Sequence, residues 1–277
     1  MNKNKLTSII HKTSKEYNVS FNVLLQTYFF ERFLSRLAMS DYREHLILKG
    51  GFLLSSLLRI KERSTIDMDF TVSDLVFNKA TMEKTIREIT QIDMGDNVLY
   101  QIKGITEIME QSKYTGYQIS LIGKLENIKV PFSIDLATGD PITRSKATYQ
   151  YQPIVYGDTI QIQRYTVETV LAEKLQTVMD KKTGNSRMKD FYDIYILMKL
   201  HKNLFDTRIL NEAIEITFSY RKTSIDKTGF LELLHILEED REFVLRWNNF
   251  VNKNDYVEKV GFKKVKNEIV ELINLYG

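Results

Sequence analysis

The 277-residue sequence predicts an α+β fold, in which a mixed sheet with flanking helices is followed by a helical C-terminal domain. Apolar residues make up 43% of the chain, which is enough to bury a sizeable core. Only 12 glycines and 3 prolines are present, fewer than a many-stranded sandwich with punctuated loops would need. Strand-like runs lie in the first half of the chain, whereas the later apolar periodicity is helical.

The elements follow from these periodicities. In the first half, 3.6-residue spacing predicts helices over residues 5–17, 20–39, 52–60 and 79–92, and Ser20 is a suitable N-cap for the second. Alternation predicts strands over residues 45–48 and 65–72, and three more within 98–137. The second half is predicted as helices over residues 166–179, 188–200, 206–218, 229–248 and 255–275.

The domain boundary is predicted from the prolines. All three, Pro131, Pro141 and Pro153, lie in one stretch, which also contains glycines. We therefore expect an α+β domain with N-terminal helices over residues 1–150 and a mainly helical domain over residues 151–277.

Composition excludes several classes of function. The absence of cysteine rules out a disulfide framework, thiol catalysis and zinc–thiolate sites. No apolar run approaches the roughly 18 residues needed to cross a bilayer, and the first lysines are not followed by an apolar signal segment. The sequence is therefore expected to be that of a cytoplasmic protein without a membrane partner.

Charge is unevenly distributed. Residues 1–64 hold 11 Lys and Arg against 5 Asp and Glu, whereas residues 65–160 hold 9 against 13. The basic segment suits an anionic partner such as nucleic acid, although a solvated helical surface explains it nearly as well.

The acidic segment contains spaced carboxylates. In a strand that contains Ile66-Asp67-Met68-Asp69-Phe70, both aspartates share one face, with Cα atoms roughly 7 Å apart. Such a pair leans together only around a cation, and oxygen-only ligands suit Mg²⁺. A solvated acidic strand face is the alternative.

A second strand, Phe132-Ser133-Ile134-Asp135-Leu136, places Asp135 alone on its polar face. Three carboxylates from two strands are what a two-metal phosphoryl-transfer site needs. Asp135 is expected either to ligate the metal near the nucleophile or to accept the proton of the nucleophile.

Phosphate-binding residues are expected at two other places. Lys49-Gly50-Gly51 joins a strand to a helix, where glycines let the backbone approach a phosphate, although most glycine pairs are ordinary turns. Lys174 lies on the buried stripe of the helix from Val167, so it needs an anion: a carboxylate within the fold, or a triphosphate.

Two aspartates, Asp190 and Asp193, lie one turn apart on a largely apolar helix. Buried aspartates need partners, and Arg187 and Lys174 are the candidates. A structural salt bridge explains Asp190 equally well, whereas Asp193 is assigned to function.

Taken together, four segments resemble the AbiEii/AbiGii toxin family, the nucleotidyltransferase-like toxins of type IV abortive-infection toxin–antitoxin systems within the DNA polymerase β-like superfamily. The segments are Lys49 to Gly51, Arg63 to Phe70, Glu168 to Leu175 and Arg187 to Tyr195. The resemblance covers roughly residues 40–200 and implies a nucleotidyltransferase-like sheet.

The resemblance also implies an activity, the Mg²⁺-dependent transfer of a nucleotide from an NTP to a hydroxyl such as the 3′ end of tRNA. The NTP is expected to be GTP or a pyrimidine triphosphate, and the activity is expected to serve in phage defence. It implies a cognate antitoxin, expected to be a winged-helix protein. Related proteins often have Gly-Ser where this chain has Gly50-Gly51, so backbone N–H groups would have to bind the phosphate here.

The predicted site has overlapping roles. The metal ligands are Asp67, Asp69 and Asp135, and the catalytic residues are these three with Lys174 and Asp193. The nucleotide-binding residues are Lys49, Gly50, Gly51, Lys174, Arg187 and Asp190. Two other functions remain open: modification of a small molecule by the same site, and a non-catalytic nucleotide-binding protein that sequesters a partner.

Overall fold

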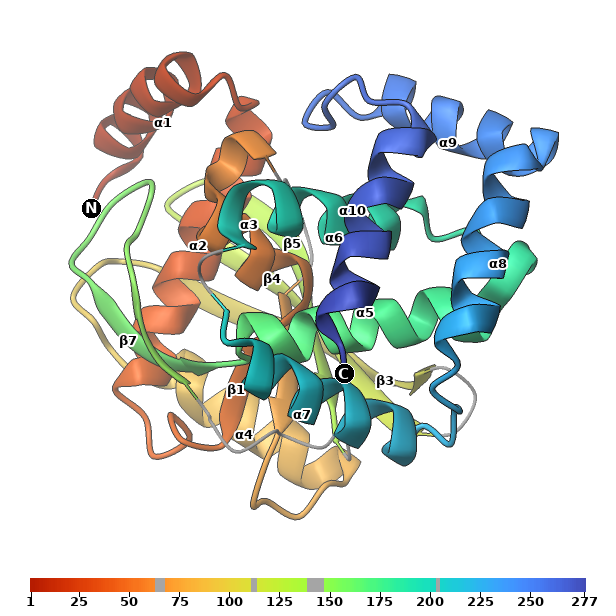
Figure 1. Ribbon diagram of the computed structural model, residues 1–277. Helices are drawn as coiled ribbons and strands as arrows, with labels where there is room; N and C mark the ends of the chain where they lie inside the picture. Colours follow the sequence, from red (N-terminus) through yellow and green to blue (C-terminus); the bar gives the residue numbers. More distant parts are fainter. Residues whose placement is uncertain (63–67, 111–113, 139–146, 203–204) are drawn as a thin grey trace. The chain divides into compact units, whose positions relative to one another are not determined.

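The computed structural model describes residues 1–62, 68–110, 114–138, 147–202 and 205–277 (Figure 1). The chain divides into two compact units. Among the described residues, unit 1 comprises residues up to 138 and 147–165, and unit 2 comprises residues from 166 to 277. The units change at Tyr165 and Thr166, later in the chain than residue 150, so residues 151–165 belong with the sheet. The assignment of two domains from the sequence stays a prediction.

Unit 1 is built on one mixed sheet, which confirms the predicted fold class. Among the described residues the sheet has seven strands in the order β3-β4-β5-β2-β1-β7-β6. The strands are β1 (Leu46–Lys49), β2 (Met68–Val72), β3 (Leu99–Glu110), β4 (Tyr114–Leu125), β5 (Ile128–Ala137), β6 (Ala147–Tyr151) and β7 (Ile160–Arg164).

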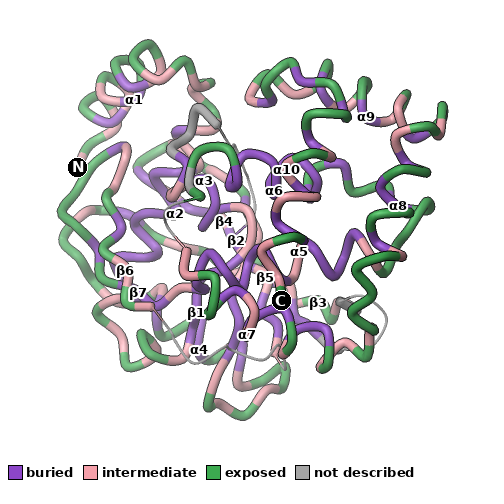
Figure 2. Tube along the Cα trace, viewed as in Figure 1, coloured by how far each residue is buried: buried purple, intermediate pink, exposed green. Residues whose placement is uncertain are grey.

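Four helices accompany this sheet: α1 (Lys3–Tyr17), α2 (Phe21–Ala38), α3 (Gly50–Glu62) and α4 (Lys79–Gln91). Helix α2 is buried along most of its length (Figure 2). It packs its aromatic side chains on the sheet, because Phe33 contacts Phe70 of β2 and Phe30 contacts Phe132 of β5. The aromatic rings of α2 thus cover the strands that carry the predicted carboxylates.

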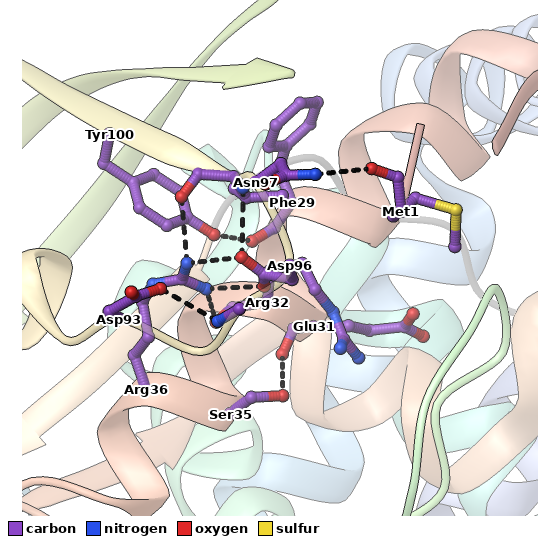
Figure 3. A network of polar contacts seen from close by, with 12 residues as sticks. Met1, Phe29, Glu31, Arg32, Ser35, Arg36, Asp93, Asp96, Asn97 and Tyr100 are labelled. Atoms are coloured by element: carbon purple, nitrogen blue, oxygen red, sulfur yellow. Dashed lines mark hydrogen bonds and ion pairs between the residues drawn. The ribbon is translucent and has the colours of Figure 1, made fainter. Parts of the chain in front are cut away.

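A buried ion pair fixes the C-terminal half of α2. Arg36 is 1% exposed and binds both carboxylate oxygens of Asp96, at 2.7 and 3.0 Å (Figure 3). Its guanidinium also donates to the carbonyl of Val98 at 2.9 Å and lies 5.3 Å from the ring centre of Tyr100. Burial raises the pKa of the Asp96 carboxyl, but the Arg36 guanidinium and the backbone N–H of Val98 together hold that pKa below its ordinary value. This contact connects α2 to the start of β3.

The middle of α2 holds a buried carboxylate. Glu31 is fully buried and accepts hydrogen bonds from the Tyr151 hydroxyl at 3.1 Å and the backbone N–H groups of Ile154 and Val155 at 2.5 and 3.3 Å. Beside it, Arg32 donates to the carbonyl of Tyr156. Desolvation raises the pKa of Glu31 to about 7 in spite of these donors. One acidic side chain therefore holds β6 and the segment after it against the helix.

Unit 2 is helical. Its elements are α5 (Val167–Lys181), the short 3₁₀ turn η1 (Lys182–Gly184), α6 (Met188–His201), α7 (Thr207–Tyr220), α8 (Lys227–Glu239), α9 (Arg241–Lys253) and α10 (Phe262–Leu275). Rings of Phe191, Phe243 and Phe262 form its core, and they meet edge to face. Trp247 is fully buried and donates from Nε1 to the carbonyl of Val260 at 2.9 Å, so it is a packing residue.

In the described part of the chain, no helix combines the length and the apolar character that a bilayer crossing requires.

Local sequence signals identify most elements, with three exceptions. The helix predicted over residues 255–275 begins only at Phe262. Ser20 caps α2 as predicted, accepting from the N–H of Val23 at 3.3 Å. The prediction of one helix over residues 229–248 is wrong, because Asp240 leaves the helical conformation and caps α9 through the N–H groups of Glu242 and Phe243. The pair β6 and β7 was not predicted, since its polar residues give little alternation.

We predict that Glu31→Gln removes a pH dependence of stability. Because the folded state raises the pKa of Glu31 from 4.5 to about 7, ionisation is easier in the unfolded chain. Its stabilising contribution is complete below pH 4.5 and is lost as pH rises to about 7, a change of about 3 kcal/mol. Denaturant melts from pH 4 to 8 should show this slope in the wild type relative to Glu31→Gln.

Glu16→Gln is the matched control, because Glu16 is exposed on α1. Its melts should lie close to those of the wild type, because substitution of an exposed side chain changes stability little. Parallel wild-type and Glu31→Gln curves would contradict the raised pKa.

Candidate active site

A row of polar residues crosses the middle of the sheet. Lys49 at the end of β1 pairs with Asp69 of β2, which in turn pairs with Asp135 of β5. Residues paired across neighbouring strands share a face, with the strands about 4.8 Å apart. The apolar neighbours in sequence, such as Met68 and Ile134, are fully buried, whereas both aspartates are half-buried. The strand alternation predicted around Asp69 and Asp135 is therefore present, and it brings the two carboxylates together.

The Asp69 carboxylate lies directly against Gly50, the first residue of α3. A Cβ atom on Gly50 would overlap with Oδ2, Cγ and Cβ of Asp69. The backbone of Gly50 also has φ +66°, a left-handed conformation that side chains disfavour. Glycine is thus required here for two reasons, and the predicted close approach at Lys49-Gly50-Gly51 is made by a carboxylate of the protein itself.

Gln118 was not predicted as a site residue. It pairs with Asp135 across β4 and β5, and its Nε2 donates to Oδ1 of Asp135 at 3.0 Å. This bond orients the carboxylate from the side opposite β2. The sequence shows Gln118 only as an amide side chain between two apolar residues, Tyr117 and Ile119. Its proximity to Asp135 depends on the register of the β4–β5 hairpin.

Lys49 is 6% exposed, and its ammonium lies 5.9 Å from the ring centre of Tyr165. The Tyr165 hydroxyl in turn shares a 2.6 Å hydrogen bond with Thr71 of β2. The side chain of Lys49 is therefore packed on an aromatic ring at the centre of the sheet. Its proposed contact with a nucleotide stays a prediction.

The donors present fit a hard cation. Asp69 and Asp135 offer carboxylate oxygens from adjacent strands, and the missing Cβ of Gly50 leaves that side of Asp69 without a side chain. Asp67, the third predicted ligand, lies outside the described residues. Within the described residues, no group of three or more His, Cys, Asp or Glu side chains has the geometry of a metal site.

A second group of predicted residues meets in unit 2. Lys174 of α5 places its ammonium between two carboxylates of α6, at 2.8 Å from Asp190 Oδ1 and 2.7 Å from Asp193 Oδ2. Both aspartate side chains are buried, and that of Lys174 is 14% exposed. The carboxylate partner that the sequence left open for Lys174 is therefore present.

Arg187 completes this group, because its Nε lies 2.8 Å from Asp190 Oδ2. Burial raises the pKa of Asp190, but the charges of Lys174 and Arg187 outweigh burial and hold that pKa below its ordinary value. Two cations thus share two buried carboxylates, and Asp190 stays ionised at neutral pH.

Comparison with known families decides the class. The family described as nucleotidyl transferase AbiEii toxin, type IV toxin–antitoxin system, matches residues 32–265, most of the chain. The chain belongs to the AbiEii toxin family. Membership confirms the resemblance seen in the sequence and the assignment to enzymes of nucleotidyl transfer, and it extends the match through α9 to the start of α10.

Two solved structures share the fold of this AbiEii family member. One is a Helicobacter pylori protein assigned provisionally as a nucleotidyltransferase, and the other is JHP933 from Helicobacter pylori. Each is 13% identical with a TM-score of 0.55, and each alignment covers 92% of this chain. They cover 95% and 92% of the respective neighbour. No curated protein matches the sequence closely enough to count as a relative.

We predict that Gly50→Ala destabilises unit 1 and displaces Asp69. The positive φ alone should cost about 1–2 kcal/mol, and the overlap with the carboxylate adds to this. Nucleotidyl transfer should fall about 100-fold, because small displacements of site groups have effects of that size. Gly104→Ala is the control, since a Cβ there meets nothing within 4 Å. Full transfer by Gly50→Ala would contradict the placement of Asp69.

We predict that Lys174→Met lowers the free energy of unfolding by about 3–5 kcal/mol at pH 7, because it leaves buried carboxylates short of a cation. Because the folded state lowers the pKa of Asp190, its stabilising contribution is complete at neutral pH and is lost only as pH falls through that lowered value. The cost of Lys174→Met should therefore shrink in acid.

Denaturant melts of Lys174→Met should be compared with Lys181→Met, an exposed lysine on the same helix. The control should change stability by less than about 0.5 kcal/mol. Equal melts for the two variants would contradict the role of Lys174 in folding. Titration of folded Lys174→Met and wild-type protein with NTP tests whether Lys174 also binds phosphate, in which case the variant should bind NTP more weakly.

Proposed function

We propose that the protein transfers a nucleotide from an NTP to the 3′-hydroxyl of an RNA, in particular tRNA, with Mg²⁺ as cofactor. The observation that carries this proposal is the register of β2 and β5, which sets Asp69 beside Asp135 next to the glycine at the start of α3. Membership of a type IV toxin family implies an NTP substrate and an antitoxin partner. The winged-helix nature of that antitoxin and a preference for GTP or a pyrimidine triphosphate belong to the proposal.

In the proposed reaction the acceptor oxygen forms a bond to the α-phosphorus, and the bond from the α-phosphorus to the pyrophosphate oxygen breaks. Asp67, Asp69 and Asp135 would hold Mg²⁺, which when bound supplies positive charge to the phosphate oxygens. Asp135, oriented by Gln118, accepts the proton of the hydroxyl or ligates metal beside it.

The remaining predicted residues bind phosphate in this proposal. Lys49 ends β1, and Gly50 and Gly51 begin α3, where backbone N–H groups suit an anion. In unit 2, Lys174 and Arg187 supply positive charge, and Asp190 and Asp193 hold these two cations in place. The aspartates therefore act through the cations they orient.

We predict that Asp67→Asn with Asp69→Asn abolishes transfer and leaves the fold intact. Removing two like charges that are two residues apart in the sequence relieves repulsion, so stability without metal should stay level or rise. Stabilisation by Mg²⁺ with NTP should disappear, because it depends on binding to the folded state. The measurements are melting curves with and without Mg²⁺ and NTP, and transfer of label from each radiolabelled NTP.

The transfer assay should offer total tRNA and small hydroxyl compounds together. Wild-type protein should label tRNA, and the double variant should label it about 100-fold less or not at all. Asp158→Asn, an exposed aspartate of unit 1, is the control and should transfer normally. Label on a small compound instead of tRNA would show that the protein modifies a small molecule. NTP binding without any transfer would show a non-catalytic nucleotide-binding protein.

A further inference from the structure

A hollow in unit 2 is surrounded by positive charge. Its volume is about 460 Å³, and it lies between the start of α6 and the face of α9. Among the side chains that line it are Arg187, Lys189, Arg246, Lys253, Asn249 and Phe250. No carboxylate is among its described lining residues.

The charge in this hollow is only partly compensated within the protein. Arg187 shares the buried Asp190 with Lys174, and Arg246 lies 3.9 Å from Glu242, which is 89% exposed. Such an exposed pair contributes little. Neither Lys189 nor Lys253 has a salt bridge within the described part of the chain, and both are exposed. The hollow therefore attracts anions.

One wall of the hollow also holds an unused donor. Nε of Arg246 is buried and has no hydrogen-bond partner among the described residues, while another nitrogen of the same guanidinium donates to the carbonyl of Thr183 at 3.3 Å. A buried N–H without an acceptor is costly unless a ligand or water satisfies it.

The chemistry of the lining favours one kind of anion. Cations interleaved with an aromatic ring and an amide are the combination that binds single-stranded nucleic acid, in which phosphates contact the cations and a base stacks on the ring. A triphosphate usually arrives with Mg²⁺, which needs carboxylate ligands, and the described lining offers none. The phosphodiester backbone binds lysine and arginine without a metal.

We propose that this hollow binds the phosphodiester backbone of the acceptor RNA strand, with Lys189 and Lys253 as phosphate contacts and Phe250 as the stacking surface. This inference rests on the proposed function in supposing an RNA acceptor. It adds the place on unit 2 where that RNA is bound. Arg187 joins the hollow to the group formed by Lys174, Asp190 and Asp193.

The test uses Lys189→Gln with Lys253→Gln in the full chain. Fluorescence anisotropy would measure binding of a labelled single-stranded RNA of about twelve nucleotides, within the range of known single-strand sites. The loss of two phosphate contacts should flatten the slope of log K against log salt by about 1.4 and weaken binding about 25-fold at about 0.1 M salt. NTP affinity should be unchanged.

Lys263→Gln with Lys264→Gln is the matched control, because both lysines are exposed on α10 and lie outside the hollow. It changes the net charge equally, so it separates a local site from general electrostatic attraction. Melting curves should be the same for both double variants, since every substituted side chain is exposed.

Two results would overturn the inference. If the hollow variant loses no more RNA affinity than the control, the RNA contacts lie elsewhere. If NTP affinity falls while RNA affinity does not, the hollow binds the nucleotide. The proposed function is tested separately by transfer of label: RNA binding through the hollow without transfer would leave this inference standing and the proposed function refuted.

Discussion

The register of β2 between its two neighbours is the constraint on which the candidate site depends. β2 runs antiparallel to β1 and parallel to β5, and this pairing puts Asp69 level with Asp135 and against Gly50. A slip of one residue would turn Asp69 to the apolar face and expose Met68, which is fully buried. The hydrophobic core thus fixes the position of the carboxylates, because the same alternation that buries the aromatic contacts of α2 presents the polar row.

Much of the fold and part of the site follow from local sequence. Alternating apolar residues around Asp69 and Asp135 predict two strands with one polar face each, and the glycine pair marks the start of α3. These signals are local, since side-chain direction in a strand depends only on odd or even position. The lysine on the apolar stripe of α5 likewise requires an anion, although its sequence leaves open which anion. The structure identifies two carboxylates on α6 as partners.

Other features depend on pairings that a single sequence does not encode locally. Gln118 contacts Asp135 only through the register of the β4–β5 hairpin. The pair β6 and β7 is held in place partly by Glu31, a buried acidic residue in the middle of α2. The break at Asp240 separates two amphipathic helices by a single residue, so helical periodicity alone joins them into one prediction. The basic hollow is assembled from side chains of two helices far apart in the chain.

The crossover between β2 and β5 has a consequence for the order of assembly. These parallel neighbours are separated in sequence by α4 and the long hairpin of β3 and β4. The sequence separation between β1 and its parallel partner β7 is larger still. Contacts between distant segments form late, because the intervening chain must first be closed into a loop. A nascent chain that has left the ribosome only as far as β4 carries Asp69 without Asp135 beside it. The paired carboxylates therefore arise only after most of the sheet has been synthesised, so partly made chains lack them.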